Sequence, residues 1–343
     1  MIDLLASEAE QQIIDSVAGF LAEKLPVTRL RPGSDGERRM EAGLSAEHWR
    51  DMASLGWFGL GIPEEQGGAG DTVIAEMLVA REIGRCAVSP SIAATIAAGH
   101  LAALAGSELL AGLMAGEHRV AGAIRLHAAS DEFHLIDARG AGYILVVDGM
   151  QARLYDAAAF ADVRRVISLD DAVILERAHL AAGARPTVQD AGSNIGRRVS
   201  LYNSAQLLGV AEAALKLAVE YAGVREQFGQ AIGSFQSIKH RCADMAVAAE
   251  AAFAQVFFAG VSQASGQPDA AYQIAAAKVT SAGAALANAR SGIQIHGGTG
   301  FTAECDAHVF LKRAHLLGQL GGERHWIRET LLTQALDDRV SLG

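Results

Sequence analysis

Residues 225–245 read REQFGQAIGSFQSIKHRCADM, and the organisation of the whole chain follows from this stretch. An apolar helical run ends where the stretch begins, and a second helical run starts near its middle. The compact turn between them contains two glycines and is flanked by Arg225, Phe228, Phe235 and Gln236. These residue types can hold a planar, phosphorylated ligand: the arginine meets phosphate, the rings cover an apolar face, and the glycines let the backbone come close. The alternative is a helix–helix corner closed by an apolar plug.

The composition is that of a globular protein with enough apolar material for two or three domains. The chain has 343 residues, of which 50% are hydrophobic and 20% are charged. Abundant alanine and only 6 prolines favour long helices. Aromatic residues make up 6% of the chain, which predicts helices that pack closely through small side chains.

The charge and the cysteines restrict the classes of partner and location. A formal net charge of -10 and a pI near 5.6 argue against nucleic acid and against an anionic membrane surface. The uncharged run 86–107 is too weakly apolar for a membrane span and predicts a buried helix. The cysteines are isolated and the histidines show no metal-ligand spacing, so no disulfide framework or metal site is expected. A cytoplasmic location follows from these features and from a start without signal-peptide character.

The first third of the chain reads as helical. Apolar spacing predicts a helix over 3–25 that ends at Pro26. Ser45 can cap a second helix, which stops at Gly56, and either Asp71 or Thr72 can cap a third. Residues 57–70 are rich in glycine and predict an irregular loop.

The character of the sequence changes twice after that. Short apolar runs at 120–124, 133–136, 143–147 and 152–155 predict strands of an antiparallel sheet or a small barrel. From about Asn194 long apolar stripes return and predict an up-and-down four-helix bundle. The predicted fold is therefore mainly α with a small β-domain, divided into an N-terminal helical domain, a middle β-domain and a C-terminal bundle at 1–116, 117–190 and 191–343.

A second glycine-rich segment, QIHGGTG at 294–300, follows a predicted helix rather than a strand. That context argues against a Rossmann fingerprint, which requires a strand, a turn and a helix. The glycines can form an ordinary helix C-cap. They can also expose N–H groups that, with the amide of Gln294, receive a pyrophosphate.

Three segments together resemble the acyl-CoA dehydrogenase family: the stretch 225–245, LGIPEEQGGAG at 60–70, and QIHGGTG. The resemblance implies FAD as cofactor and an acyl-CoA thioester as substrate. It also implies that residues of the turn and of the C-terminal loop grip the ADP portion of an FAD from the neighbouring subunit. The matching positions are Arg225, Phe228, Gln236, Gln294, Ile295, Gly297 and Gly298.

The resemblance is weak over roughly 117–190. Members of the family normally carry a T-E-P-x-A-G-S-D segment that contacts flavin and substrate, and a tryptophan-containing strand beside the flavin. Neither is present, and no tryptophan occurs between Trp57 and Trp326. A reduced middle β-domain without its usual flavin contacts is expected.

The catalytic base expected from the resemblance is also missing. The family removes the proton alpha to a thioester carbonyl, which requires a positioned carboxylate. Most members place it at the position of Gly321, and a minority at the position of Val199. Glu323 lies two residues further on, but a glutamate at the start of a helix also serves as a first-turn acid. The catalytic residue stays unassigned.

Three hypotheses remain open. The chain is a subunit of a heterotetrameric acyl-CoA dehydrogenase, as in bacterial enzymes of the family that act on steroid side-chain CoA esters and pair a complete chain with a degenerate one. In that arrangement a paralogous subunit supplies the base, and an electron-transfer flavoprotein-type protein accepts the electrons. Alternatively the chain is a self-sufficient homo-oligomeric dehydrogenase or oxidase with an unrecognised base. The third hypothesis is a helical structural protein without flavin.

Overall fold

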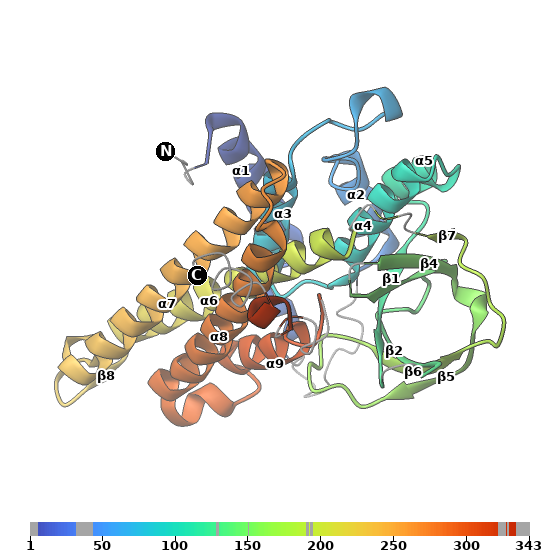
Figure 1. The fold of residues 1–343 in the computed structure, drawn as a ribbon. Coiled ribbons are helices and arrows are strands. Elements are labelled where there is room, and N and C mark those ends of the chain that lie inside the picture. Colours follow the sequence, from blue (N-terminus) through green and yellow to red (C-terminus); the bar gives the residue numbers. More distant parts are fainter. Residues whose placement is uncertain are drawn as a thin grey trace.

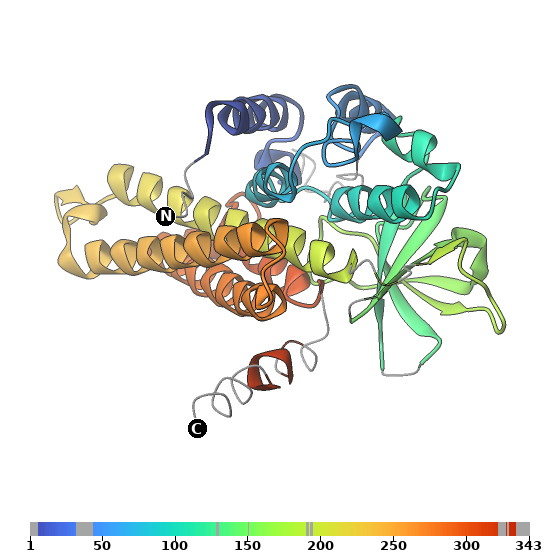
Figure 2. The ribbon, with the colours of Figure 1, turned by 45° about the horizontal axis from the view of Figure 1, so that its top comes forward.

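The computed structural model describes residues 6–31, 44–127, 130–149, 151–189, 192, 195–321, 327 and 329–333. Figure 1 shows helices from both ends of the chain with a sheet beside them. The long helices of the second half form a bundle, and the sheet lies at one end of it, next to α4 (Figure 2). The predicted class, mainly α with a β-domain in the middle, is confirmed.

The N-terminal part contains five helices within the described residues: α1 (Glu8–Lys24), α2 (Ala46–Ser54), α3 (Val73–Arg85), α4 (Ser91–Leu104) and α5 (Leu109–Met114). Side-chain oxygens cap three of them, because Ser7, Ser45 and Thr72 each accept a hydrogen bond from a first-turn N–H. Thr72, rather than Asp71, therefore caps α3. The helix α4 is buried almost throughout, as expected for the uncharged run.

The loop 57–70 folds back on itself. Gly70 N–H donates to the Ile62 carbonyl at 2.8 Å, and Gly68 N–H donates to the Pro63 carbonyl at 3.1 Å. A Cβ at Gly68 would lie 2.1 Å from the Ile62 oxygen, so only glycine fits there. The expected irregular loop is present, and its shape depends on that glycine.

The middle of the chain forms a seven-stranded sheet in the order β5-β6-β2-β1-β3-β4-β7. Its strands are β1 (Val120–Arg125), β2 (Glu132–Ile136), β3 (Tyr143–Asp148), β4 (Gln151–Asp156), β5 (Phe160–Val166), β6 (Leu175–Leu180) and β7 (Val188–Gln189). The first four match the predicted runs, whereas the last three were not predicted, because charged residues interrupt the apolar pattern of β5 and β6 and β7 has two residues.

The expected antiparallel pairing is wrong at one place, because β1 and β3 pair in parallel. Both strands run opposite to β2: β1 pairs with β2 directly, and a short connection after β2 returns the chain as β3 on the other edge of β1. The sheet is therefore mixed.

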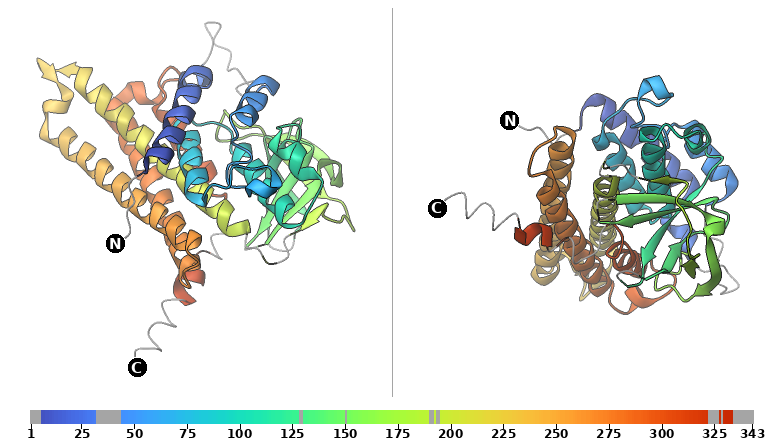
Figure 3. Two further views of the ribbon diagram at one scale, coloured as in Figure 1. Left: turned by 90° about the horizontal axis from the view of Figure 1, so that it is seen from above. Right: turned by 45° about the vertical axis from the view of Figure 1, so that its right-hand side comes forward.

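The C-terminal part consists of α6 (Ile195–Val224), α7 (Gln236–Ala264), α8 (Ala270–His296) and the shorter α9 (Ala307–Leu317). A two-stranded hairpin, β8 (Glu226–Gln227) and β9 (Gln230–Ala231), joins α6 to α7. This hairpin lies at the end of the bundle opposite to the sheet, as Figures 1 and 3 both show.

Helix α7 is long and apolar enough to cross a membrane by length and composition alone. In the structure it packs along α8 and α6, which explains the apolar face as a bundle core. Small residues set the close packing of the other helices. A Cβ at Gly209 of α6 would lie 2.0 Å from the Arg81 carbonyl oxygen of α3, so the two backbones meet directly at this crossing.

Candidate functional site

The turn after α6 presents its side chains to solvent. Arg225 is exposed and has no hydrogen-bond or ion-pair partner for its guanidinium among the described residues. Phe228 is 94% exposed and adopts a φ of +52°, followed by Gly229 at +78°. A bulky residue in the left-handed region is a strained arrangement, and such strain is often kept where a ligand is bound. The turn is thus an exposed tip with an aromatic ring and a cation on its surface.

The C-terminal loop has the same open character. Gln294 and Ile295 belong to the last turn of α8, and the glycines follow it in a 3-10 helix, Gly297–Phe301. Gln294, Gly297 and Gly298 are exposed, and a Cβ at either glycine would have no atom within 4 Å. Backbone at these positions is accessible to a ligand that approaches closely.

An apolar cluster joins the turn and the loop. Ile295, 5% exposed, packs with residues of α6 and α7 and with the segment that leads into α7; the cluster contains Ala218, Ala222, Met245, Ile232, Ile238 and Cys242. Beside it the His296 ring stacks on Tyr221 with centroids 4.2 Å apart. The predicted residues from the two motifs, 70 positions apart in the sequence, are thereby brought to one end of the bundle. Ile295 itself is a packing residue of this end.

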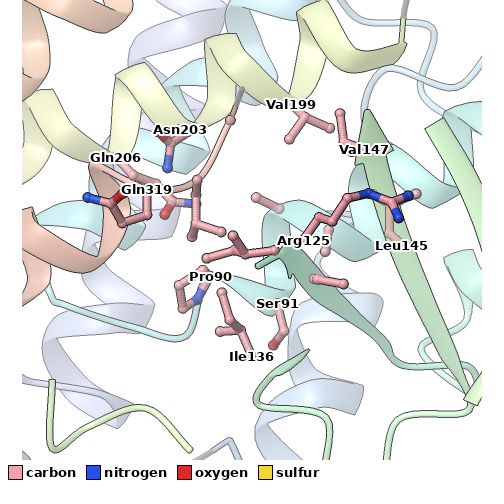
Figure 4. A pocket seen from close by; sticks show the side chains of 17 residues that line it. Pro90, Ser91, Arg125, Ile136, Leu145, Val147, Val199, Asn203, Gln206 and Gln319 are labelled. Atoms are coloured by element: carbon pink, nitrogen blue, oxygen red, sulfur yellow. The ribbon is translucent and has the colours of Figure 1, made fainter. Parts of the chain in front are cut away.

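A pocket lies at the other end, where the sheet meets the helices (Figure 4). It has about 790 Å³ of space between its walls, a figure that includes open solvent at its mouth. Its described lining is mostly small or apolar and comes from α4 and the residue before it, β1, β2, β3, α6 and the segment after α9. The lining residues are Pro90, Ser91, Ala93, Ala94, Gly122, Ala123, Ile124, Arg125, Ile136, Leu145, Val147, Val199, Asn203, Gln206, Gln319, Leu320 and Gly321. The loop 60–70 contributes none of these residues.

Both positions considered for the missing base line this pocket. Val199 reaches it from α6, and Gly321 reaches it from the segment after α9. The described lining contains no carboxylate, and its one charged side chain, Arg125, is paired with Asp148 at 2.9 Å. Glu323 lies outside the described residues.

The two positions differ in the space around them. Gly321 has a φ of +75°, and a Cβ there would lie 2.8 Å from the Asn203 Cβ. A side chain at 321 would therefore be strained and would collide with α6. Val199 is half-buried and already directs a side chain into the pocket.

Two buried polar groups near the pocket were not identified from the sequence. Lys278, in the alanine-rich α8, is 2% exposed and donates hydrogen bonds to Asn203 Oδ1 and to the Leu317 carbonyl. Glu76 is 1% exposed and accepts hydrogen bonds from Tyr202 and Arg198, each at 2.6 Å. Each is a charged residue inside an otherwise apolar helical run, which marks the position in the sequence, but only the packing of the helices shows that the side chain is buried.

The comparisons with known proteins agree with this architecture. Residues 7–111 match the model of the acyl-CoA dehydrogenase N-terminal domain, and residues 198–336 match that of the acyl-CoA dehydrogenase C-terminal domain. Acyl-CoA dehydrogenase FadE34 of Mycobacterium tuberculosis is 36% identical over 320 residues, which are 87% of this chain and 44% of that protein. Acyl-CoA dehydrogenase IpdE2 of the same organism is 33% identical over 91% of this chain and 93% of its own length.

Solved structures share the fold over nearly the whole chain. The ChsE4–ChsE5 complex from Mycobacterium tuberculosis superimposes with a TM-score of 0.80 at 19% identity, covering 97% of this chain and 99% of that one. A structure described as a steroid ACAD gives a TM-score of 0.80 at 21% identity, with the same coverage. At such identities the likeness establishes the fold alone.

This chain belongs to the acyl-CoA dehydrogenase family. The resemblance drawn from the motifs is therefore confirmed, as is the predicted class of enzyme. The family is FAD-dependent, and the expected cofactor agrees with it. The residues present fit the phosphate-bearing dinucleotide portion of FAD, because they offer an exposed cation, an exposed ring and open glycine backbone. The assignments of individual FAD-binding residues and the domain boundaries stay predictions.

Proposed function

We propose that this chain is the base-less subunit of a heteromeric, FAD-dependent acyl-CoA dehydrogenase. It lends its phosphate-facing turn to a flavin held mainly by a related chain. The observation that carries the proposal is the pocket, where both base positions meet and neither bears a carboxylate.

The chemistry of the reaction explains why that matters. Dehydrogenation removes a proton from the alpha carbon of the thioester, and the flavin accepts the hydride from the beta carbon. A valine and a glycine cannot take the proton. Among the described residues, the other polar side chains that line the pocket are amides, a hydroxyl and a paired guanidinium, none of which is a base near neutral pH.

The distance between the two sites supports a shared cofactor. Val199 lies in the pocket and Val224 lies at the turn, so α6 separates them by about 37 Å at 1.5 Å per residue. The ribityl and pyrophosphate linker of a single FAD does not extend that far. Arg225 and the C-terminal glycines can therefore serve a flavin whose ring lies in a neighbouring subunit, but not one in this chain's own pocket.

The relatives agree with an assembly of two related units. The ChsE4–ChsE5 structure is described as a complex of two named chains. The matched part of FadE34 is less than half of that protein, which leaves room for a second unit of similar size. The structural neighbour described as a steroid enzyme favours a CoA ester of a steroid-derived acid as substrate.

We further propose that the assembly is a heterotetramer, that an electron-transfer flavoprotein-type protein accepts its electrons, and that it is located in the cytoplasm.

The test is expression of this chain alone and together with a complete paralogue. Flavin per chain is measured by absorption, and dehydrogenation is measured with an acyl-CoA and an artificial electron acceptor. The proposal predicts little flavin and no turnover for the chain alone, and half as many flavins as chains in an active complex. Full flavin occupancy and comparable turnover by this chain alone would instead establish the self-sufficient homo-oligomer.

A further inference from the structure

The pocket is lined by an amide whose orientation is fixed by a buried lysine. Asn203 lies on α6 with 4% of its surface exposed, and its side chain lines the pocket. On the far side of this amide is Lys278, which reaches across from α8 and donates to Asn203 Oδ1. The same ammonium donates to the Leu317 carbonyl at 2.8 Å, at the end of α9.

The position of Lys278 determines which end of the amide faces the pocket. A buried ammonium is costly unless acceptors surround it, and it has donors but no acceptor. The Asn203 oxygen must therefore turn to Lys278, which leaves the NH₂ group on the other side. In Figure 4 the amide nitrogen of Asn203 points away from α6, toward the pocket.

This NH₂ group has no hydrogen-bond acceptor among the described residues. The pocket that it faces is lined mainly by small and apolar side chains, such as Ala94 and Ile124, and the amides of Gln206 and Gln319 lie on the same side as Asn203 (Figure 4). Gly321 packs against its Cβ and prevents Asn203 from moving toward that wall. The nitrogen is not fully enclosed by protein and is open to the pocket, so a ligand oxygen placed there accepts its hydrogen bond.

We propose that the pocket binds an apolar ring system that carries an acceptor oxygen, a carbonyl or a hydroxyl, and that Asn203 is the residue which selects for that oxygen. Lys278 is its positioning residue. The inference rests on the proposed function, because the pocket is the base-less counterpart of an active site. It adds that this site still binds a ligand, of oxygenated polycyclic or monocyclic chemistry, although it cannot remove a proton from it.

The test uses two probes of nearly equal shape, trans-1-decalone and trans-decalin, titrated calorimetrically into the full chain in the assembly that it forms. The decisive variant is Asn203→Asp. Its carboxylate keeps the contact with Lys278 and the volume of the side chain, but it offers no donor to the pocket. We expect the Kd of the ketone to rise about tenfold, as for the loss of a hydrogen bond to a buried group, while the Kd of the hydrocarbon changes less than about twofold.

A second variant, Lys278→Met, lets the amide rotate and should weaken ketone binding selectively, with the thermal melting curve as a check on folding. Any of three results would overturn the inference: unchanged ketone affinity in Asn203→Asp, an equal loss of affinity for both probes, or no binding of either probe to the wild-type chain. Neither probe contains a thioester, and calorimetry needs no turnover. A negative result here therefore leaves the flavin count per chain, and with it the proposed function, unaffected.

Discussion

At the scale of single residues, the two base positions are not equivalent. Gly321 is a position that no side chain can occupy without moving Asn203, and its backbone favours glycine. Val199 is a position where a larger side chain would extend into existing space. A carboxylate can therefore be introduced from α6 but not from the segment after α9.

The variant Val199→Glu should create a weak general base. The measurement is exchange of the alpha protons of phenylacetyl-CoA in D₂O, a substrate without beta hydrogens, so that exchange is observed without dehydrogenation. We expect exchange at least about tenfold above that of the wild-type chain, below the roughly 10²–10⁴ of evolved general bases. Gly321→Glu is the matched comparison and should show no gain and a lower melting temperature. Folded Val199→Glu protein without added exchange would contradict the placement of this pocket.

Arg225 is the second residue-scale case. Its exposed guanidinium has no partner among the described residues, so its removal costs the free chain little. In the complex, Arg225→Ala should lower FAD affinity tenfold or more, since hydrogen bonds to charged groups contribute about 1.5–3 kcal/mol. Flavin affinity is measured by titration of the apoprotein. The control is Arg50→Ala, which removes an exposed arginine on α2. Equal flavin affinities in the two variants would show that the turn is not part of the cofactor site.

At the scale of elements, the crossing of α3 and α6 fixes the geometry of the pocket. Two glycines make it possible: a Cβ at Gly84 would lie 2.1 Å from the Gln206 carbonyl oxygen, and one at Gly209 would lie 2.0 Å from the Arg81 carbonyl oxygen. Around this contact, Arg81 forms an ion pair with Glu212 at 2.6 Å. The short distance between the helices holds Val199 and Asn203 at the pocket wall.

Gly209→Ala should therefore destabilise the fold, because the added methyl meets backbone that cannot move away. We expect a loss of about 1–3 kcal/mol, as for overpacked cores, measured by urea unfolding. Gly283→Ala is the control: this glycine lies on an exposed face of α8 with no atom within 4 Å of an added Cβ. There the substitution should raise stability by about 0.5–1 kcal/mol through higher helix propensity. A neutral Gly209→Ala would disprove the close crossing.

At the scale of the whole molecule, a buried polar group ties the N-terminal helices to the bundle. The Glu76 carboxylate of α3 meets His100 of α4 at 2.5 Å, and it accepts hydrogen bonds from Arg198 and Tyr202 of α6. A Cβ at Gly61 would lie 2.4 Å from the Glu76 carboxylate, so the loop 57–70 also closes over it. The group connects four segments that are distant in sequence.

This connection predicts a difference in acid stability. Burial alone raises the pKa of Glu76, but its hydrogen bond and attraction to His100, with Arg198 and Tyr202, outweigh burial and hold the pKa below its ordinary value of 4.5. A depressed folded-state pKa stabilises the fold above the unfolded-state value, and the stabilisation is lost as pH falls through the folded-state pKa. Glu76→Gln should cost about 3–5 kcal/mol near pH 7.

The measurement is thermal melting of wild type and Glu76→Gln between pH 7 and pH 3. The difference between them should be constant well above the ordinary pKa of 4.5 and should narrow as pH falls below that value and through the lower folded-state pKa of Glu76. Glu65→Gln, at an exposed position in the loop 57–70, should show no such trend. A difference that does not change with pH would mean that the Glu76 effect is one of packing rather than charge.

Local patterns were sufficient for much of this molecule. Helix periodicity, the caps at Ser45 and Thr72, the glycine-rich loop and the first four strands all follow from residues close together in the chain. The segments 225–245, 60–70 and 294–300 likewise identified the family, because their wording resembles it in three places. Only interactions between distant segments decided the remainder. The parallel pairing of β1 with β3 depends on which sheet edge is free, and the three polar or short later strands form because a neighbouring edge accepts them.

The pocket is the clearest case of such a long-range effect. Three features depend on packing between segments up to 122 positions apart: Val199 and Gly321 line the same pocket, Asn203 leaves no room at 321, and Lys278 orients Asn203. A lysine in an alanine-rich run looks like a solvated residue when only its neighbours in the chain are known. Its burial, and hence its effect on the pocket, arises because α8 packs against α6 and α9, and helix packing of this kind is a property of the folded chain and not of any local stretch.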